Sequence, residues 1–169
     1  MCMSNLDSLK SAVVSELKKR GATLFVAESC TGGLICKLIT DVSGASSVLK
    51  GGIVSYVNEI KMNMLGVPSD IIDKYTEVSY ECAEKMAEGA KVSSGADFSL
   101  SSTGYASGGD GVPQGMEGVV FIGLSDKNGT QSHRFKFEGT RDEVRSQAAE
   151  KAMELLLIKL ERANDEGNQ

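Results

Sequence analysis

The sequence is poor in the side chains on which several classes of binding site depend. Its 169 residues include no tryptophan, one histidine and only 5% aromatic residues, which argues against binding of bases by stacking. The four cysteines form no Cys-x-x-Cys pair, and His133 is the single histidine, so the spacing of a metal site is missing. We expect no bound metal.

Basic charge and long apolar runs are also scarce. The net charge of −5 gives no positive field that would attract nucleic acid. No apolar run approaches the length of a membrane-spanning helix, and the opening MCMSNLDSLK lacks the order of a signal peptide. These features predict a cytoplasmic protein with neither a nucleic-acid nor a membrane partner.

What is present fits one compact α/β domain. Apolar residues make up 41% of the chain and charged residues 24%, as in ordinary globular proteins. Short apolar segments alternate with segments of helical spacing, and the expected strands are 23–27, 51–57, 98–103, 119–124 and 131–137. The last two form a hairpin with Asn128-Gly129 at its tip. We expect a mixed sheet in a single domain over 1–163, followed by a polar, frayed tail over 164–169.

Several helix boundaries can be predicted from capping residues. Asn58 is the expected N-cap of a short helix, and Ser79 that of a longer helix ended by Gly95. Thr140 and Glu143 form a capping box at the start of the last helix.

Three segments rich in polar residues and glycine follow expected strands: SCTGG (29–33), SYVNEIK (55–61) and TGYASGGDG (103–111). Ligands of α/β sheets bind beyond the carboxyl ends of parallel strands. The three segments are therefore predicted to meet at one site.

Ser29 lies where a strand turns into a helix, and free N–H groups at a helix start stabilise a phosphate or an oxyanion. A nucleophilic serine needs a base, and His133 is a poor candidate because it alternates with Phe135 and Phe137 on one strand face. Lys61 is the better candidate. A position in a first helical turn and partial burial would both lower its pKa, leaving a neutral amine. Tyr56 could relay the proton.

Each of these interpretations has an alternative. Lys61 could be a solvated surface lysine. Cys30 is a rival nucleophile, since a thiolate at a helix start is activated, and adjacent residues cannot both face one pocket. The SCTGG segment could also be a plain turn with a cap and a packed cysteine. The five glycines between positions 104 and 115 could approach a phosphate, although the loop lacks the P-loop pattern and its lysine.

Five segments, in this order, resemble the CinA C-terminal domain family, the nicotinamide-nucleotide amidases. They are AESCTGGL (27–34), SYVNEIKMNMLGVP (55–68), EVSYECAEKMAEGA (77–90), TGYASGGDGVPQG (103–115) and EGTRDEVRSQA (138–148). The resemblance covers about residues 5–160. It implies a three-layer α/β/α domain with a mixed sheet, similar to anticodon-binding-like folds, and a homodimer.

The same resemblance implies hydrolysis of the carboxamide of nicotinamide mononucleotide, a small nucleotide substrate, to nicotinic acid mononucleotide and ammonia, with no metal or organic cofactor. Ser29 matches the family's nucleophile, and Tyr56 and Lys61 match the residues that assist it. The remaining implied site residues lie in the turn and around the phosphate: Cys30, Thr31, Gly32 and Gly33 for the oxyanion side, and Thr103, Gly104 and Arg145 for the 5′-phosphate.

The glycine-rich loop departs from the family pattern T-G-I-A-G-P followed by glycines and Lys-Pro-Val-Gly. Tyr105 replaces a small aliphatic residue, Ser107-Gly108 replaces Gly-Pro, Gly115-Met116 replaces Lys-Pro, and Asp110 adds a negative charge. Two alternatives to the amidase of nicotinamide mononucleotide therefore stand. One is an amidase of the same mechanism for another amide; the other is a catalytically silent paralogue that binds a nucleotide or a protein partner.

Overall fold

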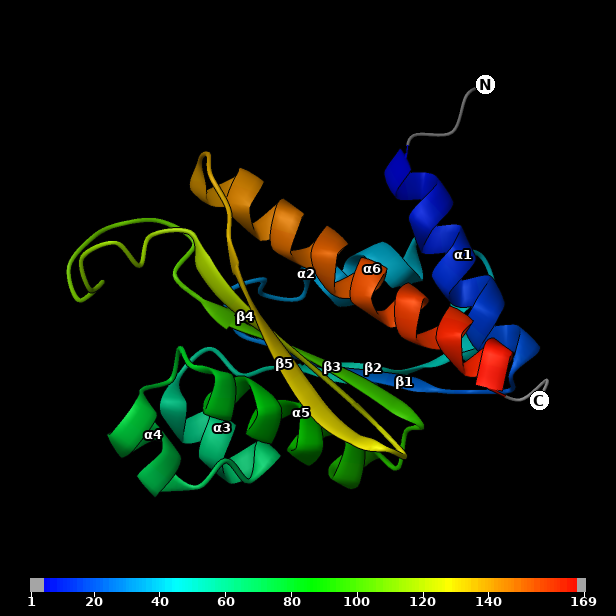
Figure 1. Ribbon diagram of the computed structural model, residues 1–169, viewed down its shortest axis with the longest axis horizontal. Helices are drawn as coiled ribbons and strands as arrows, with labels where there is room; N and C mark the ends of the chain where they lie inside the picture. Colours follow the sequence, from blue (N-terminus) through cyan, green and yellow to red (C-terminus); the bar gives the residue numbers. More distant parts are fainter. Residues whose placement is uncertain (1–4, 167–169) are drawn as a thin grey trace.

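The fold is a sheet between two layers of helices, as seen in a computed structural model that describes residues 5–166, with side chains up to residue 162 (Figure 1). In chain order the elements are α1 (Asn5–Lys19), β1 (Leu24–Glu28), α2 (Leu34–Thr40), the short 3-10 helix η1 (Ala45–Ser47), β2 (Leu49–Val54), α3 (Asn58–Leu65), α4 (Ser69–Tyr75), α5 (Tyr80–Ser94), β3 (Phe98–Gly104), β4 (Val119–Asp126), β5 (Gly129–Lys136) and α6 (Arg141–Glu166).

The five strands form one mixed sheet in the order β2-β1-β3-β4-β5. Strand β1 is parallel to both β2 and β3, whereas the pairs β3–β4 and β4–β5 are antiparallel. Glu28, the last residue of β1, lies opposite Val54 and Ser102. The carboxyl ends of three neighbouring strands therefore meet at one edge, which confirms the predicted mixed α/β sheet.

Helices α1, α2 and α6 cover one face of the sheet, and α3, α4 and α5 cover the other (Figure 1). The larger apolar core lies under the first layer and includes Leu17, Ile39 and Leu156. The residues after β3 form a long loop that projects beyond the sheet at the end where the parallel strands finish (Figure 1).

Short side chains bring α5 close to the sheet. The hydroxyls of Ser99 and Ser101 donate to the carbonyls of Ala87 and Ala83, each at 2.6 Å, so these buried polar groups are satisfied. A Cβ added at Gly123 would lie 2.5 Å from the Ala83 carbonyl oxygen, closer than van der Waals contact allows. This packing fixes the start of α5, which borders the site described below.

Several boundaries differ from the sequence prediction. Strand β2 covers Leu49–Val54, whereas a strand over 51–57 was expected. Strands β4 and β5 are longer, with Asp126 paired to Gly129, so the turn consists of Lys127 and Asn128. Helix α3 begins at Asn58, and Val57 is its N-cap. Helix α6 extends to Glu166, three residues into the predicted frayed tail, because its apolar face continues through Leu160. Residues 1–4 and 167–169 lie outside the described part.

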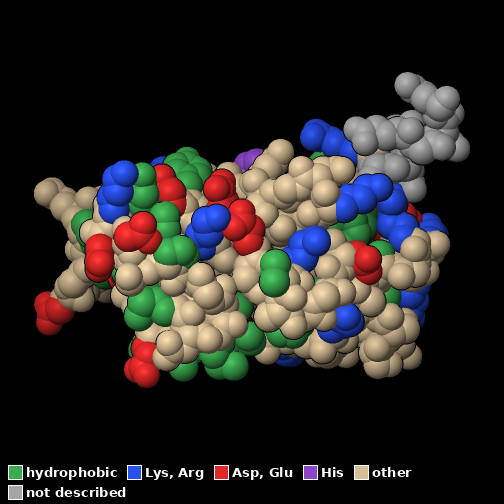
Figure 2. All heavy atoms as spheres, turned by 90° about the horizontal axis from the view of Figure 1, so that it is seen from below, with side chains coloured by type: hydrophobic (Ala, Val, Ile, Leu, Met, Phe, Trp, Pro, Cys, Tyr) green, Lys and Arg blue, Asp and Glu red, His purple; other side chains and the backbone are tan. Residues whose placement is uncertain are grey.

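Within residues 5–166, no helix is both long and apolar enough to span a membrane. The outer face of the α3–α5 layer carries charges of both signs (Figure 2). In that view the acidic side chains gather toward the end with the projecting loop, and the basic side chains gather toward the opposite end.

Candidate active site

Ser29 follows β1 directly and is held at the end of the sheet. Its N–H donates to the Ser102 carbonyl of β3 at 2.9 Å, and the side chain is 8% exposed. The chain then turns through Gly32 and Gly33, with φ of 61° and 97°. Glycine suits this left-handed backbone, which side chains with a Cβ rarely adopt. The two glycines thus allow the chain to turn sharply into α2, and Ser29 stays at the carboxyl end of β1, where it lines the pocket.

Glu28 caps the helix behind this turn. Its carboxylate accepts the N–H groups of Gly33, Ile35 and Cys36, at 2.9, 3.1 and 2.9 Å, and is 1% exposed. The first N–H groups of a helix have no partner inside the helix, and a buried carboxylate satisfies them and complements the helix dipole. Glu28 therefore occupies the anion site that the sequence analysis assigned to a ligand.

The donors available for an oxyanion are accordingly different from those expected. The Gly33 N–H is bound to Glu28, and the Gly32 N–H donates to the Ser29 carbonyl at 3.1 Å. The N–H of Cys30 donates to no carbonyl or carboxylate of the described residues, and Cys30 lines the pocket. The N–H of the residue after a nucleophile is a common oxyanion donor. Cys30 is thus the best-placed backbone donor of the turn.

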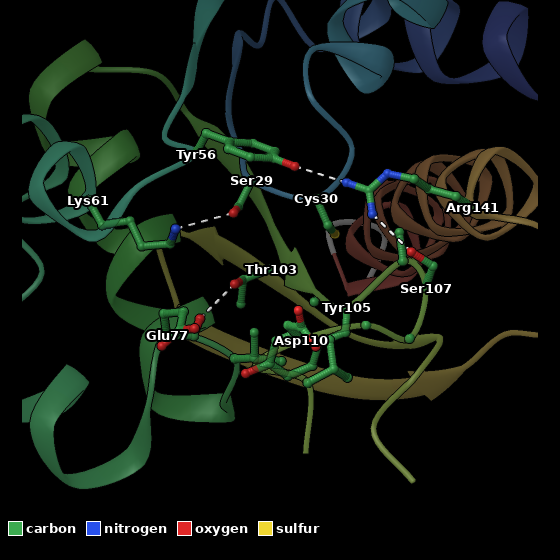
Figure 3. A pocket seen from close by; sticks show the side chains of 16 residues that line it. Ser29, Cys30, Tyr56, Lys61, Glu77, Thr103, Tyr105, Ser107, Asp110 and Arg141 are labelled. Carbon is green, nitrogen blue, oxygen red and sulfur yellow. Dashed lines mark hydrogen bonds between the residues drawn. The ribbon is translucent and has the colours of Figure 1, made fainter. Parts of the chain in front are cut away.

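Lys61 reaches the serine from the other helical layer. Its Nζ donates to Ser29 Oγ at 3.2 Å and to the Ser55 carbonyl at 2.8 Å, and the residue is 1% exposed (Figure 3). Burial lowers the pKa of Lys61, because an ammonium loses hydration there, and nearby acidic groups oppose only part of that shift. Lys61 is also the fourth residue of α3, where the helix dipole disfavours a positive charge. Lys61 is therefore buried within hydrogen-bond distance of Ser29, which is inconsistent with a solvated surface lysine.

Cys30 lines the pocket beside Ser29, so the expectation that only one of the two could face it is wrong. Cys30 is nevertheless unsuited to nucleophilic attack. The residue is 6% exposed, and burial raises the pKa of its thiol to about 12. A thiol with such a pKa is protonated near neutral pH, and the reactive species is the thiolate. The geometry therefore favours Ser29 of the two adjacent candidates.

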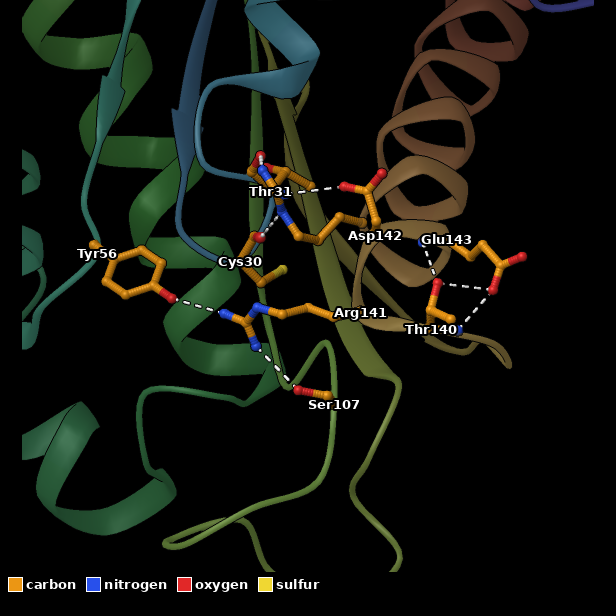
Figure 4. A network of polar contacts seen from close by, with 9 residues as sticks. Cys30, Thr31, Tyr56, Ser107, Thr140, Arg141, Asp142 and Glu143 are labelled. Atoms are coloured by element: carbon orange, nitrogen blue, oxygen red, sulfur yellow. Dashed lines mark hydrogen bonds and ion pairs between the residues drawn. The ribbon is translucent and has the colours of Figure 1, made fainter.

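Tyr56 and Arg141 face each other across the mouth of the pocket (Figure 4). Arg141 donates from Nη2 to the Tyr56 hydroxyl at 2.9 Å and from Nη1 to Ser107 Oγ at 3.1 Å. The Tyr56 side chain is 58% exposed, and its hydroxyl hydrogen remains available to a ligand. Arg141 thus links the end of β2, the glycine-rich loop and the start of α6.

Arg145, the arginine expected to meet a phosphate, does not line this pocket. Its Nε donates to the Cys30 carbonyl at 3.1 Å and its Nη2 to the Thr31 carbonyl at 3.0 Å. Arg141 and Arg145 are four residues apart and lie on one face of α6. The sequence analysis named Arg145, whereas in the structure Arg141 borders the pocket and Arg145 holds the turn.

The remaining expected site residues divide between the pocket and its supports. Thr31 Oγ1 lies 2.6 Å from Ser102 Oγ, is fully buried and ties the turn to β3. Thr103 lines the pocket, and its hydroxyl donates to the Glu77 carbonyl at 2.6 Å. Gly104 also lines the pocket, and a Cβ there would lie 2.5 Å from the Val119 carbonyl oxygen.

Together these residues border a pocket of about 290 Å³ at the carboxyl ends of β1, β2 and β3. Ser29 of the first predicted segment, Tyr56 and Lys61 of the second and Thr103 of the third all line it, so the three segments do converge. Sequence reasoning missed Glu28, Glu77 and Arg141. A carboxylate a few residues before a Gly-Gly helix start is a usable signal for a cap, whereas Glu77 and Arg141 reach the pocket only through tertiary packing.

Among the residues described, no cluster of histidine, cysteine or acidic side chains could hold a metal ion.

Comparison with known proteins agrees with this geometry. The model of the CinA C-terminal domain family matches residues 6–160. A CinA-like protein of Myxococcus xanthus is 43% identical over 151 residues, and a putative competence-damage inducible protein of Thermoanaerobacter sp. is 41% identical over 150 residues. Each alignment covers 89% of this chain and 36% of the relative, so the chain spans little more than a third of those proteins.

Solved structures show the same fold. The CinA superfamily protein from Klebsiella pneumoniae 700603 superposes with a TM-score of 0.90 and 29% identity, over 94% of this chain and 99% of that one. The competence/damage inducible protein from Agrobacterium tumefaciens gives 0.88 and 32%, over 95% and 98%. On its sequence, its three-layer architecture and the extent of these matches, the chain belongs to the CinA C-terminal domain family.

Proposed function

We propose that this protein is an amidohydrolase that removes the carboxamide nitrogen of nicotinamide mononucleotide, yielding nicotinic acid mononucleotide and ammonia. The observation that carries the proposal is the contact between Lys61 Nζ and Ser29 Oγ at 3.2 Å, with the lysine buried. A buried lysine beside a serine hydroxyl is an arrangement suited to acyl transfer without histidine.

The first half of the reaction forms an ester on the enzyme. Neutral Lys61 takes the hydroxyl proton of Ser29 as Oγ attacks the amide carbon, and the carbonyl oxygen becomes an oxyanion. The Cys30 N–H is the donor nearest to the nucleophile in the chain and would stabilise that charge. The carbon–nitrogen bond then breaks as the leaving nitrogen gains a proton from the Lys61 ammonium, and ammonia departs.

The second half returns the enzyme to its starting state. Neutral Lys61 accepts a proton from a water molecule, whose oxygen attacks the ester carbon, and Ser29 leaves with the proton held by Lys61. Tyr56 lies at the pocket mouth with its hydroxyl hydrogen available, so it can donate to the leaving nitrogen or to the substrate. Each proton removed in one step is returned in the next.

The pocket also offers a partner for the phosphate. Arg141 is the one arginine that lines it, and guanidinium groups bind phosphate oxygens through paired hydrogen bonds. Its present partners are the neutral hydroxyls of Tyr56 and Ser107, which a phosphate can displace. We assign the 5′-phosphate to Arg141, beside Gly104 and Ser107.

Ammonia release from nicotinamide mononucleotide tests the proposal, with wild type measured beside Ser29→Ala and Cys30→Ala. We expect release by wild type and by Cys30→Ala, and a loss of at least about 10³-fold in Ser29→Ala. Wild-type protein that is folded and releases no ammonia would refute the assigned reaction. Activity that is lost with Cys30→Ala and kept with Ser29→Ala would refute the assigned nucleophile.

A further inference from the structure

The charged side chains of the pocket lie on opposite walls. Arg141 is on one side with Ser107, and Glu77 lies across from it, below Lys61 (Figure 3). Asp110 of the glycine-rich loop also lines the pocket. Two carboxylates and one guanidinium therefore line the pocket, beside the Lys61 amine. A ligand that matches this arrangement carries an anionic group at one end and a positive centre near the other.

The Glu77 carboxylate has no competing cationic partner. Among the described residues it takes part in no ion pair, while its main-chain carbonyl is fixed by the Thr103 hydroxyl at 2.6 Å. The residue is half-buried in the bend between α4 and α5. A carboxylate that forms no ion pair in a partly dry pocket attracts a positive ligand group more strongly than an exposed one does.

Tyr105 places an aromatic ring beside this carboxylate. Its ring packs against the apolar cluster of Val78 and Phe121 and also borders the pocket. Burial, and after it the Glu77 carboxylate, raise the pKa of Tyr105, which agrees with the two side chains being neighbours. A tyrosine face and a carboxylate side by side both favour a cation.

We propose that Glu77, with Tyr105 next to it, makes the pocket selective for amides whose ring carries a positive charge. This inference rests on the proposed function, because the ring must lie near Glu77 while Ser29 attacks the carboxamide attached to it. Nicotinamide mononucleotide has a quaternary, positively charged ring nitrogen and a phosphate at its other end. The ring charge meets Glu77, the phosphate meets Arg141, and a neutral Lys61 does not repel the ring.

Acidic side chains on the outer face of the α3–α5 layer act in the same direction. On the face shown in Figure 2 they gather toward the end that bears the projecting loop. Such a field disfavours purely anionic ligands and raises the local concentration of ligands with a positive centre.

A binding experiment separates ring charge from every other feature of the ligand. The probes are nicotinamide mononucleotide and its 1,4-dihydro form, which keeps the carboxamide, ribose and phosphate and lacks the ring charge. Dissociation constants are measured by calorimetry in the Ser29→Ala background, so that no turnover occurs. The Glu77→Gln change is added to that background, and Glu81→Gln, which does not line the pocket, is the matched control.

We expect Ser29→Ala to bind the charged form more tightly, and Glu77→Gln to reduce that preference about tenfold with little change for the dihydro form. Glu81→Gln should keep the preference. Equal weakening of both probes by Glu77→Gln, or no preference to begin with, would overturn the selection by charge and leave the proposed reaction standing. Failure of folded Ser29→Ala to bind either probe would overturn the proposed function and this inference with it.

Discussion

In the proposed mechanism, the protonation state of Lys61 decides whether Ser29 can be activated. Its amine lies inside the protein, between the Ser29 hydroxyl and the Ser55 carbonyl. The Ser55 carbonyl orients the amine, and burial makes the neutral form accessible. Only that form can accept the serine proton, so activity is linked to the pKa of one side chain.

The pH dependence of kcat/KM should therefore rise with pH and level off below 10.5, the ordinary pKa of lysine, because burial lowers the pKa of Lys61. Ammonia release measured from pH 6 to 9.5 checks this. The Lys61→Met variant should lose about 10²–10⁴-fold in activity and lack the rising limb. An acid limb that is flat in wild type would count against Lys61 as the base.

A stability measurement gives an independent check on the same group. The pKa of Lys61 is lower in the folded protein than in the unfolded chain, so the unfolded chain binds more protons between the two values. Wild type should gain stability relative to Lys61→Met as pH rises through that interval toward 10.5. Urea unfolding at pH 7 and pH 9.5 would show it, and a difference that does not change with pH would contradict it.

We expect Arg141 of α6 to bind the ligand and Arg145 of the same helix to stabilise the fold. Arg141→Met should raise KM about tenfold or more, because it removes a guanidinium partner of the phosphate, and should leave thermal stability nearly unchanged. Arg145→Met should cost about 1–3 kcal/mol of stability, because the carbonyls of Cys30 and Thr31 lose their charged donor. Thermal unfolding and steady-state kinetics of both variants distinguish the two roles. A loss of stability in Arg141→Met together with a raised KM in Arg145→Met would reverse the assignment.

Helix α2 is the element on which the placement of Ser29 depends. Glu28 accepts three N–H groups at its start, and the turn that precedes it carries Ser29, the proposed nucleophile. Glu28→Gln puts an amide nitrogen against some of these donors. We expect a loss of about 1–3 kcal/mol in the free energy of unfolding, and a larger fractional fall in kcat than in substrate affinity.

Asp97→Asn is the matched control for that change. The Asp97 carboxylate accepts the N–H and the hydroxyl of Thr23, at 2.8 and 2.7 Å, at the opposite end of β1. It should lower stability and leave kcat unchanged. If Glu28→Gln behaved in the same way, the cap would be purely structural.

The elements were largely predictable because their signals are local. The Ser79 cap, which accepts the Cys82 N–H, and the Thr140–Glu143 box are confirmed, since each depends on residues three positions apart. Strand ends were less well predicted, as in β4 and β5, because ladder pairing extends strands beyond their apolar core. The roles of Glu28 and Arg141 depend on where a turn places N–H groups and how far a side chain reaches, and neither is encoded in residue spacing.

At the scale of the whole molecule, the sheet brings together residues that lie far apart in the chain. Ser29 follows β1, Lys61 belongs to α3 beyond β2, and Thr103 ends β3, yet all three line one pocket. The chain contains this pocket within little more than a third of the length of its relatives. The proposed mechanism requires that Ser29, after β1, and Lys61, in α3, act as one catalytic unit.

A double-mutant cycle on ammonia release from nicotinamide mononucleotide tests that requirement most directly, with wild type, Ser29→Ala, Lys61→Met and the double variant compared after their folding is verified by circular dichroism. Groups that act as a unit give losses that are not additive. We predict that the double variant is no less active than the more damaged single variant. Losses that multiply, or a Ser29→Ala variant that keeps wild-type activity, would contradict the account.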